Sequence, residues 1–305
     1  MVKISVFGAS NVDITGYTKA TLIYKDANIG TMKTTSGGVG RNIAENLQRL
    51  QFDVELFSVF ADDPLSDFLI NDCNKKQLKI DRSLIVKDSS ASTFIAIMDE
   101  HNDLALGISA MDLYDTINEN KFIDKLPAKL ESIYTVLETN FSSNILQNII
   151  KKYPEQRFVL DTVSGKKALR AIPLLHNLYI LKTNLLEAEM ISGMKIKTEQ
   201  DLKKLTGYFI DKGVKKVFIT LGKDGVIYGD AKGIYHKTSI ASKIINTIGA
   251  GDSFVAGLIY ADAQNKNIHE LAQYGMAAAA ITVQHTEAVH PGMSPEELTK
   301  IIKNE

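Results

Sequence analysis

The stretch IINTIGAGDSFVAGLIY spans residues 244–260. Gly249, Ala250 and Gly251 come directly before Asp252, and a strongly apolar run follows. Small residues leave backbone N–H groups open where a helix begins, and the positive end of the helix favours negative charge there. The stretch therefore predicts an anion site at a helix start, with the Asp252 carboxylate beside it. Simple helix capping by Asp252 would explain the same residues.

Short β-branched or aromatic runs alternate with helical patterns along the rest of the chain. KISVFG, VELFSVF, SIYTVL, RFVLD, LYILK and KKVFIT are typical of buried strands, and KKALRAIPLL is typical of a helix. In VGRNIAENLQRL, four apolar residues fall on one face of a helix, namely Val39, Ile43, Leu47 and Leu50. This alternation predicts an α/β fold in three layers, with a mostly parallel central sheet between helices.

Two segments, residues 12–35 and 81–110, interrupt the alternation. Both are rich in β-forming residues and lack helical periodicity. We expect them to pair into one small β-sheet, which could act as a lid or as a dimerisation surface. The α/β core then consists of residues 1–11, 36–80 and 111–305.

Composition narrows the class of function. The net charge is −1, from 35 basic and 36 acidic residues, so there is no electrostatic case for nucleic acid or an anionic membrane as partner. The lone Cys73 is typical of a small buried hydrophobe in a reducing compartment. No window approaches the ~18 apolar residues of a membrane span. We therefore expect a cytoplasmic protein. The six histidines lack the spacing of metal ligands.

Ligands of parallel sheets bind beyond the carboxyl ends of the strands, so each strand-to-helix junction is a candidate site. In FGASNVDITG, Asn11 and Asp13 follow the first strand, and a carboxylate there can accept from two sugar hydroxyls. In SGGVGRN, Gly38 permits close backbone approach and the Asn42 amide can bond a substrate hydroxyl. Ordinary turns, with Asn42 facing water, are the alternative. We expect Arg41 to be a solvated surface residue.

Two later junctions suggest nucleotide binding. In KTNLLEAE, Asn184 and Glu187 share one helical face and could serve a hydrated Mg²⁺. A helix cap with a first-turn acid explains the pair equally well. In ITLGKDGVIYG, a glycine turn joins two strands, and Thr220, Gly222 and Gly225 could meet phosphates or ribose. A plain hairpin needs no ligand.

In this order, GGVGRNIAENL, NLLE, TLGKDG and NTIGAGDSF resemble the PfkB, or ribokinase-like, carbohydrate kinase family over essentially the whole chain. The resemblance implies transfer of the γ-phosphoryl group of ATP to a hydroxymethyl oxygen. It is greatest to members that act on the 5′-hydroxyl of pseudouridine, through GGVGRNIAENLQRL, SAMDLYD and LDTVSGKKA. Another nucleoside or a sugar is the alternative acceptor, and a non-catalytic binding protein is a further one. A dinucleotide enzyme is disfavoured because the first junction lacks G-x-G-x-x-G.

The resemblance also implies roles for single residues. Asp252 matches the catalytic base, and Gly249, Ala250 and Gly251 match the anion hole. Sugar hydroxyls would be bound by Asp13, Gly38 and Asn42, and a base or sugar would be sensed at the lid by Met111 and Asp112. ATP would be bound by Lys166, Asn184, Thr220, Gly222 and Gly225, and Mg²⁺ would be held, through water, by Asn184 and Glu187.

Two departures from the family pattern qualify these roles. Asn246 stands where many members have an aspartate that helps to bind a monovalent cation, so K⁺ here would depend mainly on carbonyl oxygens. Val39 stands where ribokinases often carry lysine, which disfavours ribose. Because Asp252 begins a helix, we expect a low proton affinity for its carboxylate. The expected partners are a small-molecule substrate and a second copy of the chain, paired through the lid.

Overall fold

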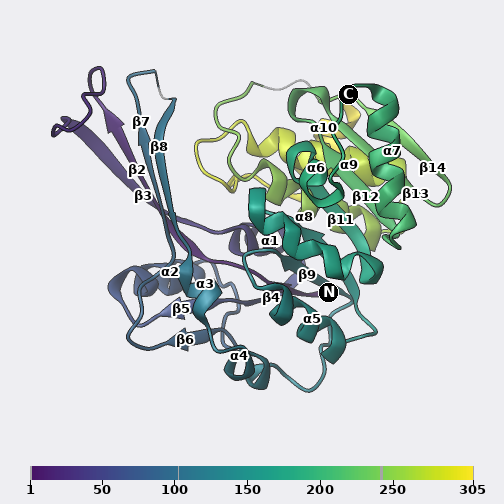
Figure 1. Ribbon diagram of the computed structural model, residues 1–305, viewed down its shortest axis with the longest axis horizontal. Helices are drawn as coiled ribbons and strands as arrows, with labels where there is room; N and C mark the ends of the chain where they lie inside the picture. Colours follow the sequence, from purple (N-terminus) through teal and green to yellow (C-terminus); the bar gives the residue numbers. More distant parts are fainter. Residues whose placement is uncertain (1, 102, 241–242, 305) are drawn as a thin grey trace.

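The computed structural model describes residues 2–101, 103–240 and 243–304, and its centre is one large sheet between layers of helices (Figure 1). The strand order is β14-β13-β12-β11-β10-β9-β1-β4. These strands are β1 Lys3–Phe7, β4 Asp53–Phe57, β9 Tyr134–Glu138, β10 Arg157–Asp161, β11 Leu178–Asn184, β12 Lys216–Thr220, β13 Val226–Asp230 and β14 Gly233–Lys237. All pairs from β4 to β12 are parallel, and β13 and β14 pair antiparallel at one edge. The mostly parallel sheet is confirmed.

The helices cover both faces of this sheet. They are α1 Val39–Arg49, α2 Pro64–Lys75, α3 Asp112–Thr116, α4 Glu119–Lys125, α5 Ser143–Lys152, α6 Leu185–Ser192, α7 Glu199–Asp211, α8 Ala250–Ala263, α9 Ile268–Thr282 and α10 Pro295–Lys303. The stretch KKALRAIPLL lies in a 3₁₀ helix, η1 Gly165–Asn177, which contains Pro173. Proline lacks the N–H that a regular α-helix needs in its interior. Among the described residues, no helix combines the length and apolar content required to cross a bilayer.

Alternation along the strands produces two cores, one on each side of the sheet. Ile4 and Val6 point to the side covered by α1, α8 and α9. Phe7 points to the other side, where its ring stacks on Phe57 at 4.4 Å between centroids. Each such side chain contributes about 1.5–3 kcal/mol when fully buried. The three predicted layers are therefore held together by apolar burial on both faces.

A separate four-stranded sheet projects from the core (Figure 1). Its order is β3-β2-β7-β8, with β2 Asn11–Thr18, β3 Gly30–Gly37, β7 Thr93–Met98 and β8 Leu104–Ala110. The β-rich segments thus pair with one another, as predicted, and β3 leads directly into α1. A short strand of the second segment, β6 Leu84–Val86, pairs instead with β5 Val59–Ala61. A separate lid domain remains a prediction.

Candidate active site

Two motifs far apart in sequence meet where α1 and α8 begin. Asp252 lies in the first turn of α8 and is only 7% exposed. Asn42, in the first turn of α1, donates from Nδ2 to Asp252 Oδ2 at 2.9 Å. The alternative that Asn42 faces water is therefore wrong, because its side chain is buried. A carboxylate and an amide are thus held together beside two helix N-termini.

The glycines before Asp252 have the geometry of an open helix start. Gly249 is the N-cap of α8, with a left-handed φ of 80°, and no side chain caps the helix. A Cβ on Gly249 would lie 2.0 Å from the carbonyl oxygen of Ala288, so only glycine fits. Ala250 N donates to the carbonyl oxygen of Thr247 at 3.3 Å, and no side chain caps the first turn of α8. A helix start without a side-chain cap can bind an anion.

Asp252 is more basic than an ordinary carboxylate. Burial, followed by the charge of Asp161, raises the pKa of Asp252 to about 7, although the Asn42 hydrogen bond and Lys182 act in the opposite direction. The nearby Asp13 adds to the increase. The expected low proton affinity is therefore wrong, because desolvation and two neighbouring acids outweigh the helix N-terminus.

Lys182, to which the sequence analysis gave no role, lies against the predicted anion hole. Its Nζ forms a buried ion pair with Asp161 Oδ2 at 2.9 Å. A Cβ on Gly251 would lie only 2.5 Å from this Nζ, so the ammonium packs directly on that glycine. Burial lowers the pKa of Lys182, but Asp161 and further acids raise it overall. A fixed positive charge therefore lies beside the start of α8.

The predicted sugar-binding residues lie together near the start of α1. Asn11 donates from Nδ2 to Asp13 Oδ1 at 2.6 Å, and burial raises the pKa of Asp13. A Cβ on Gly37 would lie 2.1 Å from Asp13 Oδ2, so the carboxylate rests against the glycine backbone. Gly38, the N-cap of α1, has φ 103°. Their binding of a substrate remains a prediction.

Arg41 is buried, whereas the sequence predicted a solvated surface residue. Its side chain is 3% exposed rather than solvated. The guanidinium forms ion pairs with Glu45 and Asp72 and donates to Asn42 Oδ1 at 2.8 Å. Because neighbouring acids compensate its charge, the guanidinium can be buried.

Glu138, the last residue of β9, is a second buried acid that the sequence analysis missed. It is fully buried and accepts from the backbone N–H of Ala9 and from both nitrogens of Asn140. Burial raises the pKa of Glu138 to about 7. Lys167 donates to Asn140 Oδ1 at 2.6 Å, whereas the predicted Lys166 is exposed. The structure therefore joins Lys167, rather than Lys166, to these polar groups.

Asn184 and Glu187 form a capping box at the start of α6. Glu187 N donates to Asn184 Oδ1 at 2.9 Å, and Asn184 Nδ2 donates to Glu187 Oε1 at 2.6 Å. Glu187 Oε2 accepts from Thr162 Oγ1 and from Asn184 N. Since both carboxylate oxygens have protein donors, contact with Mg²⁺ through water fits better than direct ligation. Residues 2–101, 103–240 and 243–304 contain no group of three or more His, Cys, Asp or Glu that could hold a metal.

The predicted ATP loop is the hairpin between β12 and β13. Thr220 ends β12, and its Oγ1 donates to the carbonyl oxygen of Thr183 at 3.4 Å. Gly222 and Gly225 have φ of 62° and 92°, so the turn uses conformations that favour glycine. A hairpin explains these residues structurally, and their contact with ATP remains a prediction.

Three predicted residues are engaged elsewhere or exposed. Met111 is 8% exposed and belongs to the apolar core, while the neighbouring Asp112 is exposed. Asn246 donates from Nδ2 to the carbonyl oxygen of Thr286 at 3.1 Å and accepts at Oδ1 from Ile248 N at 3.0 Å. Its amide therefore serves the loop before α8.

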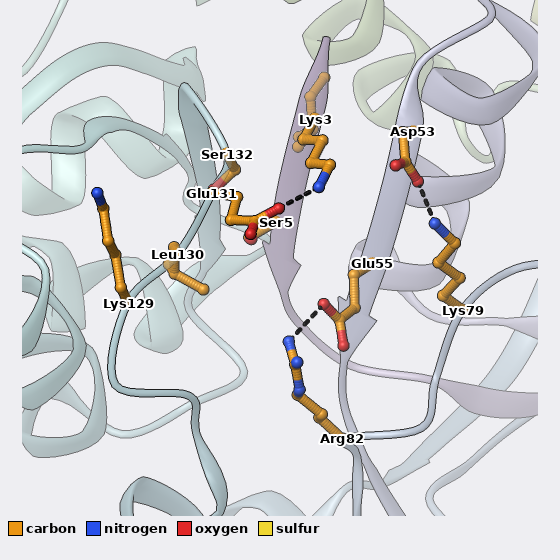
Figure 2. A pocket seen from close by; sticks show the side chains of 11 residues that line it. Lys3, Ser5, Asp53, Glu55, Lys79, Arg82, Lys129, Leu130, Glu131 and Ser132 are labelled. Atoms are coloured by element: carbon orange, nitrogen blue, oxygen red, sulfur yellow. Dashed lines mark hydrogen bonds and ion pairs between the residues drawn. The ribbon is translucent and has the colours of Figure 1, made fainter. Parts of the chain in front are cut away.

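A hollow of about 240 Å³ lies at the opposite ends of the strands (Figure 2). It is lined by the first residues of β1 and β4 and by the loop before β9. Its acids are all paired with cations, as Lys3–Glu131, Lys79–Asp53 and Arg82–Glu55. Because it faces the amino ends of the strands, it is separate from the site around Asp252.

Comparison with known proteins finds similar kinases. The chain is 28% identical over 302 residues to pseudouridine kinase of Escherichia coli strain K12, covering 98% of this chain and 96% of that protein. It is also 28% identical over 304 residues to guanosine-inosine kinase of Exiguobacterium acetylicum, covering 98% and 99% of the two chains.

A crystal structure from Clostridium perfringens, described as a candidate sugar kinase, superposes with a TM-score of 0.84 at 31% identity, covering 100% of this chain and 96% of that one. The model of the pfkB family carbohydrate kinases matches residues 1–295. This chain therefore belongs to the pfkB family of carbohydrate kinases, phosphotransferases with an alcohol group as acceptor.

Proposed function

We propose that this kinase phosphorylates the 5′-hydroxyl of pseudouridine with ATP, giving pseudouridine 5′-phosphate and ADP. The observation that carries the proposal is Asp252, a buried carboxylate bonded to Asn42 beside the uncapped start of α8. The similarity to pseudouridine kinase over 98% of the chain supports this acceptor.

In the proposed reaction Asp252 is the general base. The acceptor oxygen forms a bond to the γ-phosphorus, the bond from that phosphorus to the ADP oxygen breaks, and the hydroxyl proton passes to an Asp252 oxygen. Because burial raises the pKa of Asp252 to about 7, the carboxylate can accept a proton near neutral pH. Asn42, which donates to Asp252 Oδ2, would orient the carboxylate. Asp13 and Asn11 would hold the other sugar hydroxyls.

The start of α8 would stabilise the charge on the phosphoryl oxygens. The backbone N–H groups of Gly249, Ala250 and Gly251 would face these oxygens at the N-terminus of α8, and Lys182 adds a positive charge beside Gly251. Mg²⁺, when bound with ATP, would neutralise phosphate charge, with Asn184 and Glu187 contacting it through water. Thr220 and the following glycine turn would contact the nucleotide.

The projecting sheet would serve as a lid that excludes water and pairs two subunits. Its strands carry large exposed apolar side chains, including Met32 at 75%, Leu106 at 54% and Ile108 at 52% exposed. Strand edges and apolar faces of this kind are commonly buried by a second chain. Light scattering at assay concentration should show a dimer, and a strictly monomeric protein would contradict this part of the proposal.

An ADP-release screen tests the acceptor. Pseudouridine, uridine, guanosine, ribose and fructose are compared, each with and without K⁺, and pseudouridine should give the highest kcat/KM. The equal identity to a guanosine-inosine kinase favours a purine nucleoside as the second candidate. A higher kcat/KM with guanosine or a sugar would replace the acceptor while leaving the kinase chemistry intact. Binding of nucleoside without ADP release would reject catalysis.

A further inference from the structure

The orientation of the Asn42 amide is fixed from its other side. Arg41 donates from NH1 to Asn42 Oδ1 at 2.8 Å, and the same nitrogen donates to the carbonyl oxygen of Ser36 at 3.1 Å. Asn42 Nδ2 then faces Asp252 Oδ2 at 2.9 Å. One buried chain of hydrogen bonds therefore runs from the guanidinium, through the amide, to the carboxylate.

We propose that Arg41 is a positioning residue that acts on Asp252 through Asn42. The inference rests on the proposed role of Asp252 as the base. An amide can rotate by half a turn and exchange its oxygen and nitrogen, but a guanidinium has only donors and accepts no hydrogen bond. Arg41 therefore disfavours the rotated amide, in which Asn42 Oδ1 would face the Asp252 carboxylate. In that orientation two hydrogen-bond acceptors would lie against each other.

Arg41 is itself held in place by two acids on one side of α1. Glu45 Oε2 lies 2.6 Å and Asp72 Oδ2 3.1 Å from its NH2. Both acids also contact other cations, since Glu45 pairs with Arg49 at 2.9 Å, and Lys76 lies within 3.1 Å of both. Removal of the Arg41 charge therefore leaves neither acid unpaired, so a neutral variant is compatible with folding.

A double-mutant cycle separates positioning from a structural role. The variants are Arg41→Met, Asn42→Ala and the double substitution, and Arg49→Met is the control that removes a cation from Glu45 without touching Asn42. A hydrogen bond to a charged group is worth about 1.5–3 kcal/mol, so Arg41→Met should lower kcat at least about tenfold with little change in the KM for ATP. Added to Asn42→Ala, it should lower kcat no further.

The pH dependence of kcat/KM is a second readout, because its acid limb, the fall in kcat/KM at low pH, reports protonation of the base. The groups facing Asp252 are Asp13 from β2, Asp161 from β10, Lys182 from β11 and Asn42 from α1. Loss of the oriented Asn42 donor should move this limb to higher pH in Arg41→Met and leave it in place in Arg49→Met.

The inference would be overturned if Arg41→Met kept the wild-type kcat. It would also be overturned if the double variant lost kcat by the product of the two single losses, since the two residues would then act independently. Arg41→Gln, which no longer restricts the Asn42 amide to one orientation, is put through the same cycle if Arg41→Met does not fold. Arg41→Lys, whose ammonium also has only donors, should keep more of the wild-type kcat than either variant. Asp252→Asn is measured in parallel. Wild-type kcat in Asp252→Asn would reject the proposed base itself, whereas its inactivity together with an additive cycle would reject only the role of Arg41.

Discussion

Replacement of Asp252 by asparagine should abolish most activity and, at the same time, stabilise the fold. The pKa of this buried carboxyl rises from the ordinary 3.8 to about 7. Each pKa unit is worth about 1.36 kcal/mol, so ionising Asp252 above pH 7 costs the folded protein about 4 kcal/mol relative to the unfolded chain. A neutral amide of the same shape avoids this cost and can still accept from Asn42.

The sign of the pH dependence follows from the raised pKa. Well below pH 3.8 the carboxyl is neutral in both the folded and the unfolded state, so Asp252→Asn should match the wild type in stability there. As the pH rises from about 4 to about 7, the wild type loses the stability that a protonated Asp252 gives the folded state, whereas the variant does not. The difference in the free energy of unfolding should grow to at most about 4 kcal/mol. With an unfolding entropy of about 2.1 cal/mol/K per residue over 305 residues, this corresponds to roughly 6 °C in Tm.

Thermal unfolding between pH 4 and 8 tests the predicted gain in stability, and ADP release measured in parallel tests the predicted loss of activity. Turnover should fall by about 10²–10⁴, as expected for loss of a general base. Asp262→Asn is the matched control on the same helix, because Asp262 is also buried but is paired with Lys216 and Arg157. It should destabilise the protein. A variant of Asp252 that is less stable than wild type at pH 8, or that keeps its turnover, would refute the reasoning.

Three further substitutions probe the same site. Gly251→Ala places a Cβ 2.5 Å from Lys182 Nζ and should lower kcat, measured by ADP release, because it displaces the ammonium. Gly207→Ala is the control and should leave kcat unchanged, because its Cβ makes only ordinary contacts. Asp161→Asn removes a charge that raises the pKa of Asp252 and frees Lys182, so the acid limb of kcat/KM should move to lower pH. Val163→Gly should raise the free energy of unfolding in urea by about 1 kcal/mol, because the β-branched Val163 has φ 56°.

The sequence predicted the parts of the site that depend on local pattern. Gly249 and Asp252 are neighbours in the chain, so the helix start, its glycine conformation and the adjacent acid follow from one motif. Asn42 was identified in the same way, as a polar residue in the first turn after two glycines. The layered sheet followed from alternating strand and helix patterns, because those patterns reflect which faces are buried.

The parts that depend on topology were missed. Glu138, Asp161 and Lys182 each lie at or near the carboxyl end of a different buried strand, and only the strand order brings them together. The available signal was a charged residue closing a strand that is otherwise apolar, as in YTVLE and RFVLD. Arg41 was misjudged because helical spacing alone does not show that Asp72, on another helix, lies close enough to compensate its charge.

The error over the acidity of Asp252 shows how the fold makes a base at a position that should disfavour one. A helix N-terminus by itself stabilises a carboxylate and would give a weak proton acceptor. The parallel sheet places Asp161 beside Asp252, and β2 adds Asp13, so that burial and like charge outweigh the helix. The same position keeps the N–H groups of α8 available for phosphate. A good anion site and a carboxyl whose pKa lies near neutral can therefore share one helix start, because burial first and the charges of neighbouring acids second outweigh the helix N-terminus.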